Sequence, residues 1–168
     1  MFLNRQGNLS VFKLGLLAGL IGVLVIGLGI FAFFADQNSR RAPLNIEPFP
    51  GAEPWGAPSG VTETTRNLFF RVYGARPDDV AAYYQTKLNE HTGDGGDRCV
   101  RIPPQGELPL DPFNPNSIPY QYVCLLDRSG MGSTQFTRVV IYPGVANPDP
   151  FFDAAGATVI KYEQEWQR

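Results

Sequence analysis

Hydrophobic and polar positions divide the chain sharply near its beginning. An uncharged, strongly apolar run of 22 residues extends from Leu14 to Ala35. As a helix, a run of this length rises about 33 Å, which is enough to cross a hydrocarbon core of about 30 Å. We therefore expect a transmembrane helix over residues 14–35, preceded by a short cytoplasmic segment over residues 1–13.

A cleaved signal peptide is the alternative interpretation of this run. Signal peptides have an apolar core of about 7–15 residues, followed by a cleavage site with small residues. Here the run is longer, and bulky rings at Phe31, Phe33 and Phe34 stand where small residues would be needed. The cysteines, Cys99 and Cys124, are too far along the chain to attach a lipid there. The pattern favours an uncleaved anchor.

Charge near the run does not decide its orientation. Arg5 and Lys13 precede it, while Arg40 and Arg41 follow it closely, so the positive-inside count is tied. All 16 acidic residues of the chain follow the run, and the segment before it is short and basic. These features favour a single-pass protein of the cell membrane, with a cytoplasmic N-terminus and an extracytoplasmic C-terminal domain.

Small residues mark one face of the predicted membrane helix. The spacing i, i+4, i+7 and i+14 places four glycines together there: Gly15, Gly19, Gly22 and Gly29. Small residues allow a second helix to approach closely within a bilayer, which predicts packing against another membrane subunit. Glycine is also common in membrane helices without such a role. The run contains no ionisable side chain, which argues against a proton path or a channel built from this helix.

Composition changes after the apolar run. Residues 36–58 contain five prolines, which favour extended backbone and predict a semi-rigid linker between membrane and domain. Phe49 and Trp55 either fix this linker to a protein surface or are incidental in a loose segment.

The remaining residues, 59–168, are enough for one small domain. Alternating apolar positions predict a strand over 67–73. Pro77 with two acidic residues opens a helix whose buried stripe is Val80, Tyr84 and Leu88, ending near His91. Further strands are expected over 99–102, 120–127, 134–142 and 157–165. This β-α-β-β-β-β order predicts the α+β class: one antiparallel sheet with the helix packed on one face.

Chemistry-bearing motifs are missing from this domain. The chain has no haem-attachment, zinc, phosphate-binding or nucleophile-elbow motif. His91, the one histidine, is read as a solvated helix end, and Asp94 with Asp97 as a plain turn rather than a calcium loop. The formal net charge of −2 argues against a nucleic-acid surface. We expect no catalytic residue, cofactor or metal, and a protein that is not an enzyme.

The two cysteines fall on consecutive predicted strands. Neighbouring strands bring Cα atoms to about 4.5–5.5 Å, which is within disulfide range. We expect a Cys99–Cys124 disulfide in an oxidising compartment, the alternative being two buried free thiols.

Between these cysteines lies a proline-rich excursion, 103–119. Its apolar residues form either a docking loop for a partner or a loop folded back over the domain's own sheet: Leu108, Leu110, Phe113 and Ile118.

Two short motifs carry a resemblance to a known family. They are Phe49-Pro50-Gly51-Ala52 and, after one strand, the helical series Asp78-Asp79-Val80, Tyr83-Tyr84 and Leu88. They resemble small membrane-anchored extracytoplasmic proteins of green non-sulfur bacteria, which carry a YPGA entry and a DDVxxYY…L helix before an antiparallel sheet. The resemblance covers roughly 49–142. The family's tryptophan after the helix is missing, and the excursion 103–119 is additional.

Some single-span subunits of this kind accompany the alternative complex III quinol oxidoreductase. The resemblance therefore implies a non-catalytic accessory subunit of an electron-transfer complex, with other membrane subunits and the lipid bilayer as its partners. It carries no catalytic residues with it. The alternative is a free-standing, membrane-anchored module that binds or senses a ligand outside the cytoplasm.

Overall fold

The structure, a computed structural model, describes residues 11–92, 98–109, 111, 117–130 and 132–168. The chain divides into two compact units, one ending at Ser39 and the other extending from Arg40 to Arg168. Each unit is described by itself below.

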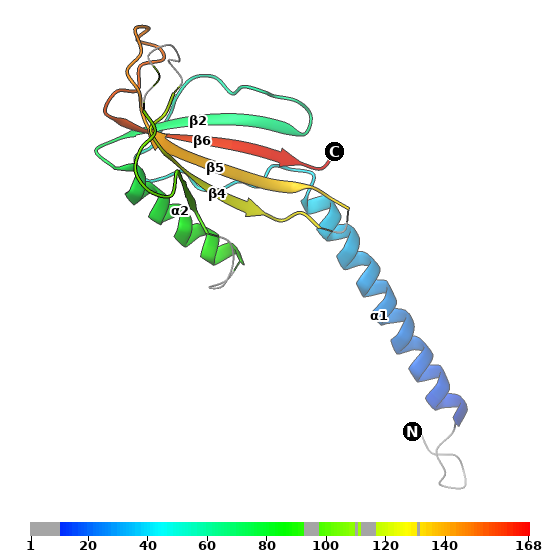
Figure 1. The fold of residues 1–168 in the computed structure, drawn as a ribbon. Helices are drawn as coiled ribbons and strands as arrows, with labels where there is room; N and C mark the ends of the chain where they lie inside the picture. The colour runs from blue at the N-terminus through cyan, green and yellow to red at the C-terminus, as the bar shows by residue number, and fades with distance from the viewer. Residues whose placement is uncertain (1–10, 93–97, 110, 112–116, 131) are drawn as a thin grey trace. The chain divides into compact units, whose positions relative to one another are not determined.

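The first unit is helix α1, Val11–Ser39 (Figure 1). It begins three residues before the apolar run and ends four residues after it, since no proline occurs before Pro43. From Phe12 onward its side chains are exposed along nearly its whole length. Within the described residues it is the one helix long and apolar enough to cross a membrane, judged by length and composition.

The second unit is a six-stranded antiparallel sheet with one helix, α2, Pro77–Thr92. The strands lie in the order β1-β2-β6-β5-β4-β3, and Figure 1 shows the four long central ones side by side. Their bounds are β1 Glu53–Pro54, β2 Thr65–Tyr73, β3 Val100–Ile102, β4 Gln121–Asp127, β5 Gln135–Pro143 and β6 Ala157–Trp166. The predicted α+β class is confirmed, and β1 is a strand that the sequence pattern did not predict.

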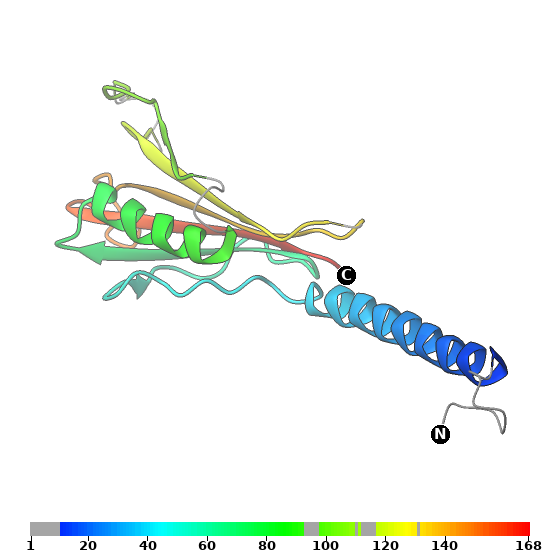
Figure 2. The same ribbon diagram turned by 90° about the horizontal axis from the view of Figure 1, so that it is seen from below.

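The core lies between α2 and one face of the sheet (Figure 2). Val80, Tyr84 and Leu88 are fully buried, as their spacing of four residues along the helix predicts. Alternate residues of each strand meet them from the sheet, among them Val139 and Ile141 of β5. In β2, Val72 belongs to the same cluster, and Leu68 and Phe70 pack against it.

The proline-rich segment requires a correction. We call residues 40–52 the strap, because they belong to the second unit and lie beside α2 on the same face of the sheet, over the part of that face that α2 does not cover. Leu44 and Ile46 pack against the core, and β1 continues the segment as a sheet strand paired with β2. Residues 36–39 belong to α1. The compact unit therefore begins at Arg40 rather than at residue 59.

The opposite face of the sheet is partly covered by the loop 144–156, which connects β5 with β6. Ala154 of this loop is buried, and Gly144 at the start of the loop makes its close approach to Ala154 possible. A Cβ atom added at Gly144 would meet the carbonyl carbon of Ala154 at 2.8 Å, which is closer than real side chains come. The loop forms one wall of the groove described next.

Candidate functional site

A groove of about 810 Å³ lies on the sheet face turned away from α2. Its floor comes from alternate residues of β4, β5 and β6, which project away from the core. Its walls come from Trp55 just after β1, the 144–156 loop, Ile102 of β3 and Ile118 at the end of the excursion. The lining residues are Trp55, Ile102, Ile118, Gln121, Val123, Arg138, Val140, Tyr142, Val145, Asn147, Phe152, Ala154, Val159, Lys161 and Glu163.

Three charged side chains stand together on the groove floor. Arg138 Nη1 lies 3.1 Å from one carboxylate oxygen of Glu163, and Lys161 Nζ lies 2.6 Å from the other. Arg138 and Glu163 are opposite each other across β5 and β6, and Lys161 is two residues away from Glu163 on the same strand face. Two cations share one carboxylate here, so the cluster carries a net positive charge.

The pKa of Glu163 reports the same imbalance. Burial alone would raise it, yet the hydrogen bond and charge of Lys161, followed by those of Arg138, hold this pKa below its ordinary value. The two cations together therefore outweigh the effect of burial on the pKa of this carboxylate.

Aromatic side chains build the groove wall above β1 and β2. Trp55 packs edge-on against Phe69, with ring centroids 6.5 Å apart, and its indole nitrogen donates to the Phe151 carbonyl at 3.1 Å. This hydrogen bond ties the β1 end of the wall to the 144–156 loop. Phe152, which also lines the groove, keeps 56% of its surface exposed, and Ile102 on the other side keeps 45%. Both walls thus present apolar surface to solvent.

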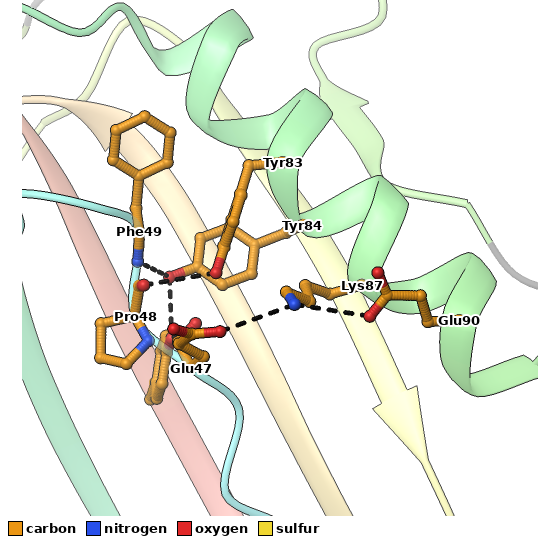
Figure 3. A network of polar contacts seen from close by, with 8 residues as sticks. Glu47, Pro48, Phe49, Tyr83, Tyr84, Lys87 and Glu90 are labelled. Atoms are coloured by element: carbon orange, nitrogen blue, oxygen red, sulfur yellow. Dashed lines mark hydrogen bonds and ion pairs between the residues drawn. The ribbon is translucent and has the colours of Figure 1, made fainter.

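On the other face of the sheet, polar groups hold the strap (Figure 3). The Phe49 amide donates to the Tyr84 hydroxyl at 3.0 Å, and the Tyr84 and Tyr162 hydroxyls are 2.7 Å apart. Tyr162 in turn donates to the Glu47 carbonyl at 3.3 Å, so Tyr84 must be the donor between the two phenols. The chain of hydrogen bonds starts and ends on strap backbone and passes through two buried side chains.

Both phenols stay neutral at physiological pH. Burial raises the pKa of Tyr84 to about 12, with its hydrogen bond to Tyr162 acting in the opposite direction. Burial, then the neighbouring Tyr84, raises the pKa of Tyr162 further. Neutral hydroxyls suit the one-way hydrogen-bond chain, which points to a structural role for this pair.

Near residue 44 the strap is held by three further side chains of the same sheet face. Thr137 Oγ1 donates to the Leu44 carbonyl at 2.6 Å, and Gln164 Nε2 donates to the same oxygen at 2.7 Å. Gln135 Nε2 donates to the Ala42 carbonyl at 2.8 Å. Buried polar residues of β5 and β6 thus satisfy strap carbonyls that would otherwise lack partners.

The structure joins Cys99 and Cys124 in a disulfide, as their strand placement predicts. Their Cα atoms are 4.1 Å apart, and Cys124 is fully buried in the core beneath α2. Cys99 directly precedes β3, and its amide donates to the Gln85 side chain of α2 at 2.8 Å. The bridge attaches the short edge strand β3, and with it Ile102 of the groove wall, to the core.

The structure describes some of the remaining predicted site residues but not all of them. The four glycines of the predicted packing face all lie on α1, and a Cβ added at any of them meets nothing within 4 Å. In the excursion, Leu108 is exposed, and Ile118 is half-buried and lines the groove. Leu110 and Phe113 lie outside the described residues, as do Asp94 and Asp97 of the expected turn. His91 belongs to the last turn of α2.

Among the described residues, no group of three or more His, Cys, Asp or Glu side chains is placed to hold a metal ion. Comparisons with known proteins found no matching family model, no similar curated protein and no similar solved structure. The family resemblance therefore stays a prediction from the motifs.

Proposed function

We propose that this chain is a single-span accessory subunit that packs in, and stabilises, a larger membrane protein complex through α1. The observation that carries the proposal is the exposed apolar surface of this helix, which carries no charged side chain from Leu14 to Ala35. Its apolar side chains are not covered by other described parts of the chain, and burial against lipid and neighbouring helices would remove that surface from water.

The glycines of α1 support a helix partner as well as lipid. Gly15, Gly19, Gly22 and Gly29 leave a shallow face on which a second backbone could lie closely. Burial of this face on a neighbouring subunit would stabilise both proteins by mass action.

The second unit supports an extracytoplasmic location. A disulfide persists in oxidising compartments, and the Cys99–Cys124 bridge lies after α1. With the domain outside, the N-terminal segment lies in the cytoplasm. Following the resemblance of the Phe49–Ala52 and Asp78–Leu88 motifs, we infer that the parent assembly is an electron-transfer complex of the alternative complex III kind, and that this subunit contributes no cofactor or catalytic group.

Substitution of the glycines tests this proposal. Gly19→Leu or Gly22→Leu should reduce capture of partner subunits by about tenfold after mild solubilisation, which corresponds to ~1.4 kcal/mol of lost packing free energy. Gly27→Leu is the matched control, because about 100° per residue places Gly27 roughly 80° away from the nearest glycine of the face. Equal capture by all three variants and the native chain, measured by affinity purification with mass spectrometry, would contradict the proposal.

A second candidate function is favoured by the groove. A volume of about 810 Å³ falls within the range of roughly 300–1,000 Å³ that small-molecule sites occupy. A free-standing, membrane-anchored module that binds or senses a ligand would use this groove and would need no subunit at α1. Such a protein would be extracted alone, and its glycine variants would behave like the native chain.

A further inference from the structure

The groove combines apolar walls with a cluster of charges that is unbalanced toward positive. Arg138 keeps 47% of its side chain exposed, while Lys161 and Glu163 keep 27% and 28%. Each cation uses one donor on Glu163, and both retain further N–H groups. Glu165, the next residue of β6 on this face, is not among the residues that line the groove.

The apolar surroundings restrict which anion would gain from this charge. Val140 and Tyr142 continue the floor from Arg138 along β5, and Ile102, Phe152 and Trp55 stand at the walls. A fully hydrated inorganic anion would gain little from such surroundings. A molecule with one carboxylate and an apolar body would meet both parts of the groove, because its head pairs with the cations and its body covers exposed apolar surface.

We propose that the groove binds a small amphiphilic monocarboxylate, with its carboxylate at Arg138 and Lys161 and its apolar body against Val140, Ile102 and Phe152. Glu163 pairs with both cations on the floor before the ligand arrives, so it competes with the ligand's carboxylate for them. The site lies wholly within the second unit, so it goes beyond the role of α1 and does not depend on it.

Tryptophan fluorescence tests this directly, because Trp55 lines the groove and Trp166 is the only other tryptophan. In a Trp166→Phe background of the full chain, held in maltoside micelles, 8-bromooctanoate should quench Trp55 saturably. The uncharged analogue 8-bromooctan-1-ol should bind at least about tenfold more weakly, since it cannot form the charge-assisted hydrogen bonds. Equal quenching by acid and alcohol would overturn the proposal, because it would show partition into the micelle.

Charge variants locate the carboxylate. Arg138→Gln and Lys161→Gln should each weaken binding by about tenfold. Lys87→Gln, which removes the same charge from α2 on the other side of the sheet, should bind as the parent does. Glu163→Gln removes the competing carboxylate and should bind several-fold more tightly. A fall of this variant to the level of Arg138→Gln would contradict the proposed charge balance.

Two further outcomes distinguish the carboxylate site from the subunit contact at α1 and from a protein interface at the groove. Gly19→Leu should leave the quenching unchanged, so a failure of the subunit proposal at α1 would not affect the groove. If the acid fails to quench Trp55 while Arg138→Gln and Lys161→Gln lose protein partners, the groove is a protein interface and the carboxylate proposal is wrong. Circular dichroism of each variant checks that the sheet is intact.

Discussion

The two faces of the sheet use their polar side chains in opposite ways. On the face beneath α2 and the strap, Thr137, Gln164 and Tyr162 donate to backbone carbonyls of the strap. On the groove face, Arg138 and Lys161 are paired with Glu163 and line an open space. These three donors of the first face are satisfied by the fold itself, so they stabilise it. On the second face, Arg138 and Lys161 keep further N–H donors that a bound molecule could use.

The comparison predicts that equal substitutions have unequal effects on the two faces. Ile141→Ala removes a fully buried side chain beneath α2, which should cost about 2–5 kcal/mol of unfolding free energy. Ile102→Ala removes the same atoms from the groove wall, where the side chain is 45% exposed, and should cost about 1 kcal/mol or less. Urea unfolding of the full chain, followed by tryptophan fluorescence, measures both. Similar losses would mean that the groove wall is as important to stability as the core.

The disulfide connects the two faces, because it anchors β3 to the core while β3 carries Ile102 to the groove. A sequence separation of 25 residues implies that the bridge stabilises by about 3 kcal/mol through its effect on the unfolded chain. The double variant Cys99→Ala, Cys124→Ala should lose this amount.

Reduction provides the control for that prediction. A reductant should lower the stability of the native protein toward that of the double variant, and should leave the variant unchanged. Free thiols in denatured, unreduced protein taken from membranes would show that the bridge does not form in the cell.

The hydrogen-bond chain through the two buried phenols is expected to have a smaller but specific effect. Tyr84→Phe leaves the Phe49 amide without its acceptor and removes the donor to Tyr162, so it should cost about 1–3 kcal/mol. Tyr83→Phe is the matched control, because its hydroxyl reaches the Pro48 carbonyl only at 3.4 Å and at an exposed site. It should change stability by about 0.5 kcal/mol or less. Equal losses of stability in Tyr84→Phe and Tyr83→Phe would show that the buried hydrogen-bond chain contributes no more than the exposed hydroxyl does.

The parts of the molecule that local periodicity controls were predictable from the sequence. Alternation over 67–73 identified the strand β2, and the spacing of four identified the buried stripe of α2. Strand neighbourhood was enough to pair Cys99 with Cys124. In each case the signal lies in residues close together in sequence or on adjacent strands.

The sequence pattern predicted neither the strap nor the groove, because their contacts join parts of the chain that are far apart in sequence. The prolines of residues 36–58 indicate extended backbone correctly, but an extended segment can be a spacer or can lie on a sheet. The choice depends on Thr137 and Gln164, which are about a hundred residues away. Likewise, Arg138 and Glu163 become partners only through the register of β5 with β6. The available signal for the groove floor was the run of charged residues at alternate positions in the second half of β6, Lys161, Glu163 and Glu165.

Acid titration gives the smallest expected effect and the finest test of the groove face. Because the folded-state pKa of Glu163 lies below its ordinary value, its ionised form contributes stability that is fully present above that ordinary value and is lost as pH falls through the folded pKa. The native chain should therefore exceed Glu163→Gln in stability near neutral pH, by less than about 1 kcal/mol for so accessible a cluster, and the difference should shrink below about pH 4.5. Lys161→Gln should weaken this acid dependence, since Lys161 is the stronger of the two cationic influences. A difference that stays constant from pH 7 to about pH 3 would show that Glu163 contributes through packing, and that the groove floor is less positive than its geometry implies.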